Sequence, residues 1–139
     1  MKLLVKKCRV EVKLPTRAHH DDAGIDLYAC GNHTVEPHQT VSIPLGIAME
    51  IAEGYVGLIW DKSSVGSKGI KTLGGVIDAG YRGEVSVVVN NMNNTAYTFE
   101  HGHKVAQMLI QKVDFPEIVE TEELSDSHRG VGGFGSTGK

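Results

Sequence analysis

The chain has 139 residues, of which 40% are hydrophobic and 22% are charged, and its formal net charge is −3. This length and hydrophobic content favour a folded protein over a disordered one, and we expect residues 1–139 to form one domain. The slightly acidic balance excludes the broad basic surface of a nucleic-acid-binding protein, although it allows a local cationic pocket. The apolar runs are too short to cross a bilayer, so we expect neither nucleic acid nor a membrane as a partner.

The cysteine content indicates a reduced compartment. Cys8 and Cys30 have no metal-ligand spacing, and two cysteines favour a cytoplasmic protein over a disulfide scaffold. No targeting signal is visible, which leaves a viral or organellar context open. We expect the seven histidines to lie on the surface rather than in a metal site.

Alternation of apolar and polar residues predicts most of the secondary structure. Strands are expected at residues 9–14, 41–45, 47–51 and 85–89, with Gly, Asn, Asp and Pro in the turns between them. One short helix is expected to begin at Ser63–Ser64, where a serine can cap the first backbone N–H groups. The pattern predicts an all-β fold, a distorted jelly-roll β-barrel, with an extended, flexible C-terminal arm over about residues 117–139.

The arm ends in RGVGGFGSTGK, which has several interpretations. A dinucleotide-binding fingerprint needs a strand before it and a helix after it, and a P-loop needs a following helix, so neither fits. The segment could be a simple flexible tail. Glycine, however, lets backbone N–H groups approach phosphate closely, and Arg129, Phe134, Ser136 and Thr137 suit phosphate and a flat ring. We therefore favour an arm that orders over a bound nucleotide.

Two earlier segments are candidates for an anion or metal site. Asp26 lies among the apolar residues of AGIDLYA, where a carboxylate is costly unless it is hydrogen-bonded or faces a site; the alternative is a capping aspartate in a turn. Lys62, Ser63 and Ser64 combine a cation and hydroxyls at the expected start of the helix, which suits an anion but also describes an ordinary capped helix.

The segment LGGVIDAGYRGEV is the most informative interior stretch. Residues 73–76 predict a tight hairpin whose backbone can offer N–H and C=O groups to a flat base. Asp78 is ionised at neutral pH and can take a proton from water, with Tyr81 nearby. The alternative is a β-hairpin with no chemical role. Further along, Gln107 is a polar residue in an apolar strand, and its amide needs a partner if buried.

In this order the segments resemble the five motifs of the homotrimeric dUTP diphosphatase (dUTPase) family, from Ala23 to Gly138. Each motif is weak alone, but five in sequence ending in RGVGGFGSTG are very specific. The resemblance implies a jelly-roll subunit, a homotrimer with active sites shared between subunits, and Mg²⁺ as cofactor. It also implies hydrolysis of dUTP to dUMP and pyrophosphate, which keeps uracil out of DNA and supplies dUMP for thymidylate synthesis.

The resemblance also assigns roles to individual residues. Asp78, placed in the barrel wall, would deprotonate the water that attacks the α-phosphate, and Asp26 would touch Mg²⁺ only through water. The remaining positions would bind substrate: Lys62, Ser63, Ser64 and Gln107 at the phosphates, Thr72, Leu73, Gly74 and Val76 at uracil, Tyr81 at the deoxyribose, and Arg129, Phe134, Gly135, Ser136 and Thr137 in the closing arm.

The sequence departs from the family pattern at several of these positions. Lys62 and Lys104 replace arginines, which keeps the charge but loses the bidentate fork. Thr72 stands where many relatives have an asparagine that contacts uracil, and His103 stands where an acidic residue is common.

Two other functions are weighed against hydrolysis. The dCTP deaminases share the fold, but their catalytic glutamate corresponds to Val88 here, so no acid–base group is present at that position. A non-catalytic binding module is the third hypothesis, and the full set of motifs argues against it as the sole role.

Overall fold

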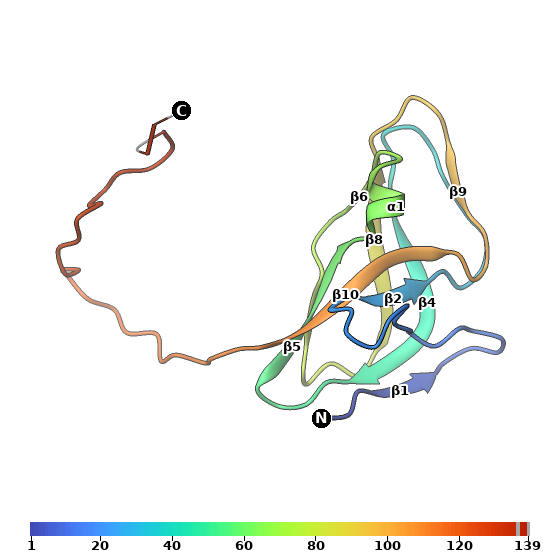
Figure 1. Cartoon of the computed structure of the whole chain (residues 1–139), viewed down its shortest axis with the longest axis horizontal. Coiled ribbons are helices and arrows are strands. Elements are labelled where there is room, and N and C mark those ends of the chain that lie inside the picture. The colour runs from blue at the N-terminus through green and yellow to red at the C-terminus, as the bar shows by residue number, and fades with distance from the viewer. Residues whose placement is uncertain (136, 139) are drawn as a thin grey trace.

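The computed structural model describes residues 1–135 and 137–138. These residues form ten strands and one short helix (Figure 1). The elements are β1 (Leu4–Lys7), β2 (Ile25–Tyr28), β3 (His33–Val35), β4 (Thr40–Glu50), β5 (Tyr55–Asp61), α1 (Ser63–Gly66), β6 (Ile70–Thr72), β7 (Val76–Asp78), β8 (Glu84–Asn91), β9 (Tyr97–Phe99) and β10 (Lys104–Lys112). The predicted all-β fold with one short helix is confirmed.

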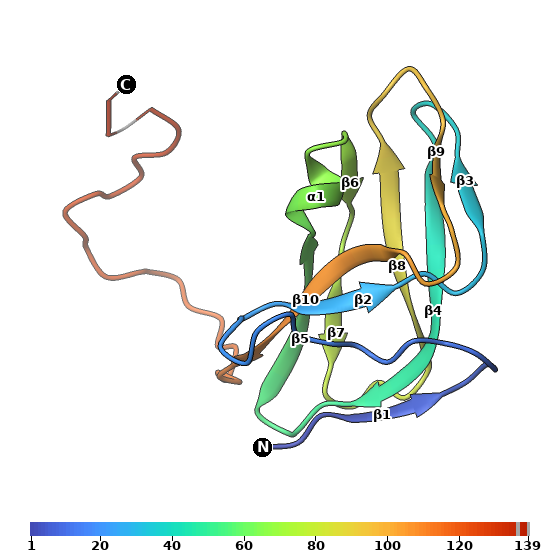
Figure 2. The same cartoon turned by 45° about the vertical axis from the view of Figure 1, so that its right-hand side comes forward.

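The strands form two four-stranded sheets and a small two-stranded sheet. One large sheet has the order β1-β4-β8-β6, the other has the order β2-β10-β5-β7, and β3 pairs with β9. All pairs are antiparallel, and neighbours in each sheet come from distant parts of the chain. Figure 2 shows the two large sheets side by side, as in a distorted jelly roll.

The core lies between these sheets and is built by alternation. In β8, the side chains of Val85, Val87 and Val89 are at most 1% exposed, whereas Val88 faces outward. Ile43, Leu45 and Met108 complete the same core cluster from β4 and β10. Alternation has this effect because successive side chains of a strand point to opposite faces.

The strand expected at residues 9–14 is absent, and this prediction was wrong. Glu11 has a φ of 61°, in the left-handed region, which breaks the extended backbone. As a result Val10 is exposed while Val12 is buried, although both were expected on one face. The edge strand is instead β1, which pairs with the second half of β4.

The two runs expected at residues 41–45 and 47–51 are one strand, β4. Its pairing with β8 shifts between Pro44 and Ala48, where Gly46 has a φ of 69°. A β-bulge of this kind bends a strand without ending it, so a single strand serves two partners along its length.

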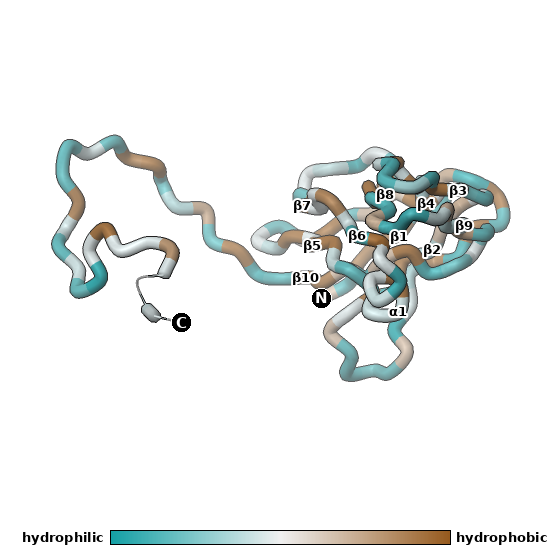
Figure 3. Tube along the Cα trace, turned by 90° about the horizontal axis from the view of Figure 1, so that it is seen from above, coloured by the Kyte–Doolittle hydropathy of each residue, from teal (hydrophilic) through white to brown (hydrophobic). Residues whose placement is uncertain are grey.

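The chain leaves the sheets after β10. The described residues from Val113 onward form no strand, and their side chains are largely exposed. Figures 1 and 3 show this segment running away from the sheets. Among the described residues, no helix has the length and apolar character needed to span a bilayer.

Candidate functional site

Lys62 stands at the junction between β5 and α1. Its extended backbone (φ −78°, ψ 125°) makes it the N-cap residue, and its carbonyl accepts the N–H groups of Val65 and Gly66. The prediction that a serine caps the helix is wrong, because Ser63 and Ser64 already lie inside the first turn and no side chain caps it. Both hydroxyls are on exposed residues beside Lys62.

Asp26 binds two lysines from other elements. It lies on β2 and is only 3% exposed. Lys62 Nζ lies 2.8 Å from Oδ1, and Lys104 Nζ, from the start of β10, lies 2.8 Å from Oδ2. The alternative of a turn-capping aspartate is excluded. Two lysines and one aspartate leave one net positive charge, which suits an anionic ligand.

The ion pairs decide the charge state of Asp26. Burial alone would raise its pKa, but the hydrogen bonds from Lys104 and Lys62 and their positive charges outweigh it and hold the pKa below its usual value. The same contact raises the pKa of Lys104 through its hydrogen bond to Asp26. Asp26 and Lys104 are therefore both charged near neutral pH.

Gln107 and Gly24 shape a polar pocket beside this cluster. The Gln107 amide donates to the backbone carbonyl of Asp61 at 2.9 Å, which is the partner that the sequence analysis required. A Cβ at Gly24 would lie 2.1 Å from the Gln107 side-chain oxygen, so any other residue there would displace the Gln107 amide. The pocket has a volume of about 290 Å³ and is lined by Ala18, Asp22, Ala23, Gly24, Asp26, Lys62 and Gln107.

The segment 73–76 is a crossing rather than the expected hairpin. β6 before it pairs with β8, whereas β7 after it pairs with β5 in the other sheet. Gly75 makes the crossing possible, because it has a φ of 118° and its carbonyl accepts the Ile59 N–H. Leu73, Gly74 and Val76 remain exposed along it, and a hollow of about 240 Å³ lies between the crossing, Thr72 and Trp60.

Asp61 is a neighbour of this hollow that the sequence analysis missed. One carboxylate oxygen accepts both the backbone N–H of Thr72 (2.8 Å) and its hydroxyl (2.7 Å), and the other binds the ammonium of Lys71. Burial alone would raise the pKa of Asp61, but these hydrogen bonds lower it below its usual range. Residues 61 and 72 are far apart in sequence, so no local spacing indicated the contact.

Asp78 lies at the end of β7, with its side chain exposed rather than enclosed in the barrel wall as expected. Its backbone carbonyl accepts the Tyr81 N–H (3.1 Å), and the Tyr81 hydroxyl donates to the Glu84 carbonyl at 3.0 Å. These bonds fold the turn so that Asp78 and Tyr81 line one hollow of about 310 Å³.

The predicted residues form two groups at opposite ends of β5. Asp78 pairs with Val56, near the start of that strand, whereas Lys62 follows its last residue. Six residues of extended chain separate these positions, which is about 20 Å at roughly 3.3 Å per residue. Within one chain, Asp78 is therefore remote from the cluster around Asp26.

The arm residues lie apart from both groups. Arg129 donates to the carbonyl of Gly132, three residues along, and Phe134 is fully exposed. Gly135 and Thr137 are exposed as well. The remaining predicted arm residue, Ser136, lies outside the described residues.

Comparison with known proteins shows the family of this chain. The dUTPase family model matches residues 10–138, which covers both groups and the arm. The chain belongs to the dUTPase family.

Individual dUTPases match over almost the whole chain. The deoxyuridine 5′-triphosphate nucleotidohydrolase of Mycolicibacterium gilvum is 39% identical over 98% of this chain and 94% of the relative. The dUTPase of Staphylococcus bacteriophage 80alpha, solved with dUpNHpp, superposes with a TM-score of 0.93 at 31% identity, covering 99% of each chain. The dUTPase of phage phi11 of S. aureus, described with a structural Mg(II) ion, has a TM-score of 0.85 at 27% identity and covers 91% of this chain and 100% of that chain.

The lysines that replace the arginines of the dUTPase pattern have a structural explanation. Each presents a single ammonium group to one oxygen of Asp26, an arrangement that does not use the planar fork of arginine. His103 Nε2 lies 3.3 Å from a carboxylate oxygen of Glu100 in the same turn. This histidine therefore contacts its own turn and not the cluster around Asp26.

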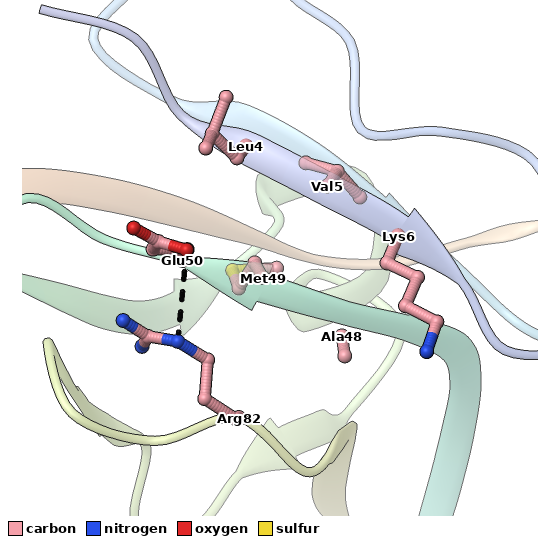
Figure 4. A pocket seen from close by; sticks show the side chains of 7 residues that line it. All are labelled: Leu4, Val5, Lys6, Ala48, Met49, Glu50 and Arg82. Carbon is pink, nitrogen blue, oxygen red and sulfur yellow. Dashed lines mark ion pairs between the residues drawn. The ribbon is translucent and has the colours of Figure 1, made fainter.

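A further hollow of about 340 Å³ lies between β1 and β4 and holds none of the predicted site residues (Figure 4). Arg82 reaches across it toward Glu50, at 3.7 Å. Its other walls are Leu4, Val5, Lys6, Ala48 and Met49.

Proposed function

We propose that this chain hydrolyses dUTP to dUMP and pyrophosphate, with Asp78 activating the attacking water. The observation that carries the proposal is the buried Asp26 held between Lys62 and Lys104, within the residues that the dUTPase family model matches. Removing dUTP in this way would keep uracil out of DNA and supply dUMP for thymidylate synthesis.

The cationic cluster is proposed to hold the phosphates. Lys62 and Lys104 have side chains 23% and 43% exposed, so each can offer its remaining N–H donors to phosphate oxygens. Gln107 lies in the same pocket, and Ser63 and Ser64 lie beside it. These groups would orient the triphosphate so that pyrophosphate departs from the side opposite the attacking water.

Asp78 is proposed to be the general base. Its carboxylate would take one proton from a water molecule as the water oxygen bonds to the α-phosphorus. The bond between the α-phosphorus and the bridging oxygen breaks, and pyrophosphate leaves with the electron pair. General-base assistance of this kind contributes about 10²–10⁴ in rate. The exposed position of Asp78 leaves it open to the solvent that supplies the water.

The separation of the two groups supports a site shared between copies of the chain. The water that Asp78 activates must come within about 3–3.5 Å of the α-phosphorus, and the other phosphates follow directly, each joined through one oxygen. Asp78 and Lys62 of one chain are too far apart for this, because they stand at opposite ends of β5. We infer that Asp78 of one copy serves the phosphates held by another, in a homotrimer. Arg129, Phe134, Gly135, Ser136 and Thr137 of the arm would close over the nucleotide.

Mg²⁺ is proposed as the cofactor. Among the described residues, no group of three or more His, Cys, Asp or Glu side chains could hold a metal ion, and both oxygens of Asp26 already bind lysines. This donor set fits Mg²⁺ only as a hydrated ion that arrives on the triphosphate, with Asp26 reaching it through water. The bound ion would neutralise charge on the phosphate oxygens.

Uracil and deoxyribose are proposed to bind along the crossing. Backbone groups of Leu73, Gly74 and Val76 would contact the base, and Tyr81 would lie against the sugar. Tyr81 is held in place by its hydroxyl bond to Glu84, and a ring packed there would leave no room for a 2′-hydroxyl.

The test is pyrophosphate release from dUTP, dCTP, dTTP and UTP by the purified protein with Mg²⁺. We expect turnover of dUTP and little of the others, and we expect Asp78→Asn to lose at least 100-fold in kcat while still binding a dUTP analogue. Ammonia release from dCTP would instead establish a deaminase. Analogue binding without turnover by the unaltered chain would establish a binding module.

A further inference from the structure

Thr72 has only one hydrogen-bonding arrangement open to it. Its hydroxyl carries one proton, and that proton is given to Asp61 Oδ1 at 2.7 Å. Asp61 accepts this bond as a carboxylate, because its other oxygen binds the Lys71 ammonium. An ionised carboxylate has no proton to donate, so the direction of the bond is fixed. The Thr72 oxygen therefore has lone pairs, and no proton, left for any other partner.

Thr72 also faces a ligand-sized space. It is only 8% exposed, yet it lines the hollow of about 240 Å³ with Gly74, Gly75 and Val76 of the crossing. Its backbone N–H is taken by Asp61 as well, at 2.8 Å. Both donors of Thr72 are thus taken by Asp61, so its side chain can offer a ligand in the hollow only an acceptor.

We infer that Asp61 is a positioning residue that makes Thr72 an acceptor for the ring N3–H of uracil and thereby rejects cytosine. Uracil carries a proton on N3, whereas N3 of cytosine is itself an acceptor and would meet the lone pairs of Thr72. A site built around a hydrogen bond rejects a ligand that cannot make it, because the buried polar group is left unpaired. The inference rests on the proposed function, since it places the base at this hollow.

The test compares kcat/KM for dUTP and dCTP in Asp61→Asn. Asparagine keeps only one acceptor oxygen, and when that oxygen faces the Lys71 ammonium its NH2 group faces Thr72. In that orientation the amide donates to the Thr72 oxygen and frees the hydroxyl proton to turn toward the hollow. We expect the ratio of kcat/KM for dUTP to kcat/KM for dCTP to fall at least ten-fold. The change should come from a higher KM for dUTP rather than from a lower kcat. A purely structural role for Asp61 would lower both nucleotides equally, and an unchanged ratio would overturn the inference.

Three further variants isolate the hydroxyl bond. Lys71→Met removes the neighbouring ion pair but keeps both Thr72 bonds, so it should retain the ratio. Thr72→Ser keeps the hydroxyl and should also retain it, whereas Thr72→Val should lower it as Asp61→Asn does. The double variant Asp61→Asn/Thr72→Val should lose no more than either single variant, because both remove the same interaction. Additive losses would contradict the inference.

Binding measurements separate this inference from the proposed function. Calorimetric titration with dUMP and dCMP needs no catalysis, so it reports base selection even if the chain turns over no dUTP. If the unaltered chain binds dUMP more tightly than dCMP and Asp61→Asn abolishes this preference, the inference is supported whether or not the chain hydrolyses dUTP. If the unaltered chain binds dUMP and dCMP equally, the inference is overturned. If Asp61→Asn does not fold, as judged by its thermal transition, Thr72→Val and Thr72→Ser carry the comparison.

Discussion

Asp26 shows how a buried carboxylate is retained in an otherwise apolar strand. Leu27 and Ile25 beside it are at most 5% exposed, and the charge is tolerated because both oxygens are hydrogen-bonded to lysines. Since the depressed pKa belongs to the folded state only, its stabilising effect is present above the unfolded pKa of about 3.9 and is lost as pH falls through the folded pKa.

Asp26→Asn is therefore expected to remove part of the acid sensitivity. At pH 7 the free energy of unfolding should fall by about 1.5–3 kcal/mol, the range for hydrogen bonds to charged groups, with Lys104 too exposed for a larger effect. Urea unfolding between pH 7 and pH 3 measures this. The difference in free energy of unfolding between the variant and the unaltered chain should shrink toward the acid end of this range. A difference that does not change with pH would show that it does not arise from the ion pairs of Asp26.

Residue-level prediction from sequence succeeded where one residue type was out of place in its local pattern. Asp26 and Gln107 were found because each interrupts an apolar strand. Asp61 was not found, because its partners Lys71 and Thr72 come from β6 and meet it only through the fold. The role of Lys62 as N-cap was missed because a serine is the commoner residue there.

At the scale of elements, Gly75 determines how the chain crosses between sheets. A Cβ at this position would lie 2.6 Å from the Ile59 Cβ, and the φ of 118° is itself unfavourable for any other residue. Gly74 beside it has a φ of 69°, but no atom would lie within 4 Å of its Cβ. Comparing the two glycines therefore distinguishes the effect of steric overlap, which only Gly75 would cause, from the effect of backbone strain, which both share.

Gly75→Ala is expected to destabilise the fold more than Gly74→Ala. Backbone strain costs of order 1–3 kcal/mol at either position, and Gly75→Ala must in addition displace Ile59 or break its hydrogen bond to the crossing. Chemical denaturation of both variants gives the difference. Equal losses would mean that the contact with Ile59 can relax without cost.

Element-level prediction worked where alternation was uninterrupted. The run 85–89 became β8 as expected, because a half-buried strand in a sheet imposes that period. It failed at residues 9–14, where the positive φ of Glu11 overrides an alternating sequence, and at 73–76, where glycines mark a crossing instead of a hairpin. Alternation does not reveal which strand a segment will pair with.

At the scale of the whole molecule, the described part of the arm (residues 117–135 and 137–138) runs away from the sheets of its own chain. Phe115, Ile118 and Leu124 are 76–96% exposed, a large apolar content for a segment in water. The last bond between the backbone of this segment and the sheets is from the Val113 N–H to the Gly54 carbonyl. The sequence predicted the arm from fading alternation, whereas its resting place in an assembly depends on contacts that one chain does not contain.

Truncation after Ser127 tests the role of the arm. Because the hydrogen bonds of the described residues after Ser127 stay within the arm, we expect a folded protein with unchanged thermal transition and oligomeric state. Activity on dUTP should fall severely, since the deletion removes Arg129, Phe134 and Thr137. Full activity in the truncated protein would show that the arm has no part in turnover.

Mixing two inactive variants tests whether sites are shared between chains. Asp78 on β7 pairs with Val56 near the start of β5, whereas Gln107 on β10 pairs with Trp60 near its end. Neither Asp78→Asn nor Gln107→Ala should be active alone. If each site combines Asp78 of one copy with Gln107 of another, oligomers refolded from an equimolar mixture contain some sites with both native residues, and activity returns. Sites confined to one chain would give no recovery, with each variant refolded alone as the control.

The bond between Asp61 and Thr72 also bears on how this lineage can change. An asparagine at position 72 could give its amide protons to Asp61 and turn its carbonyl oxygen toward the hollow, which preserves the acceptor. As long as position 61 keeps its carboxylate, threonine and asparagine at position 72 can therefore replace one another without loss of the acceptor. If the carboxylate were lost first, neither residue would be held as an acceptor, so the order of substitutions matters.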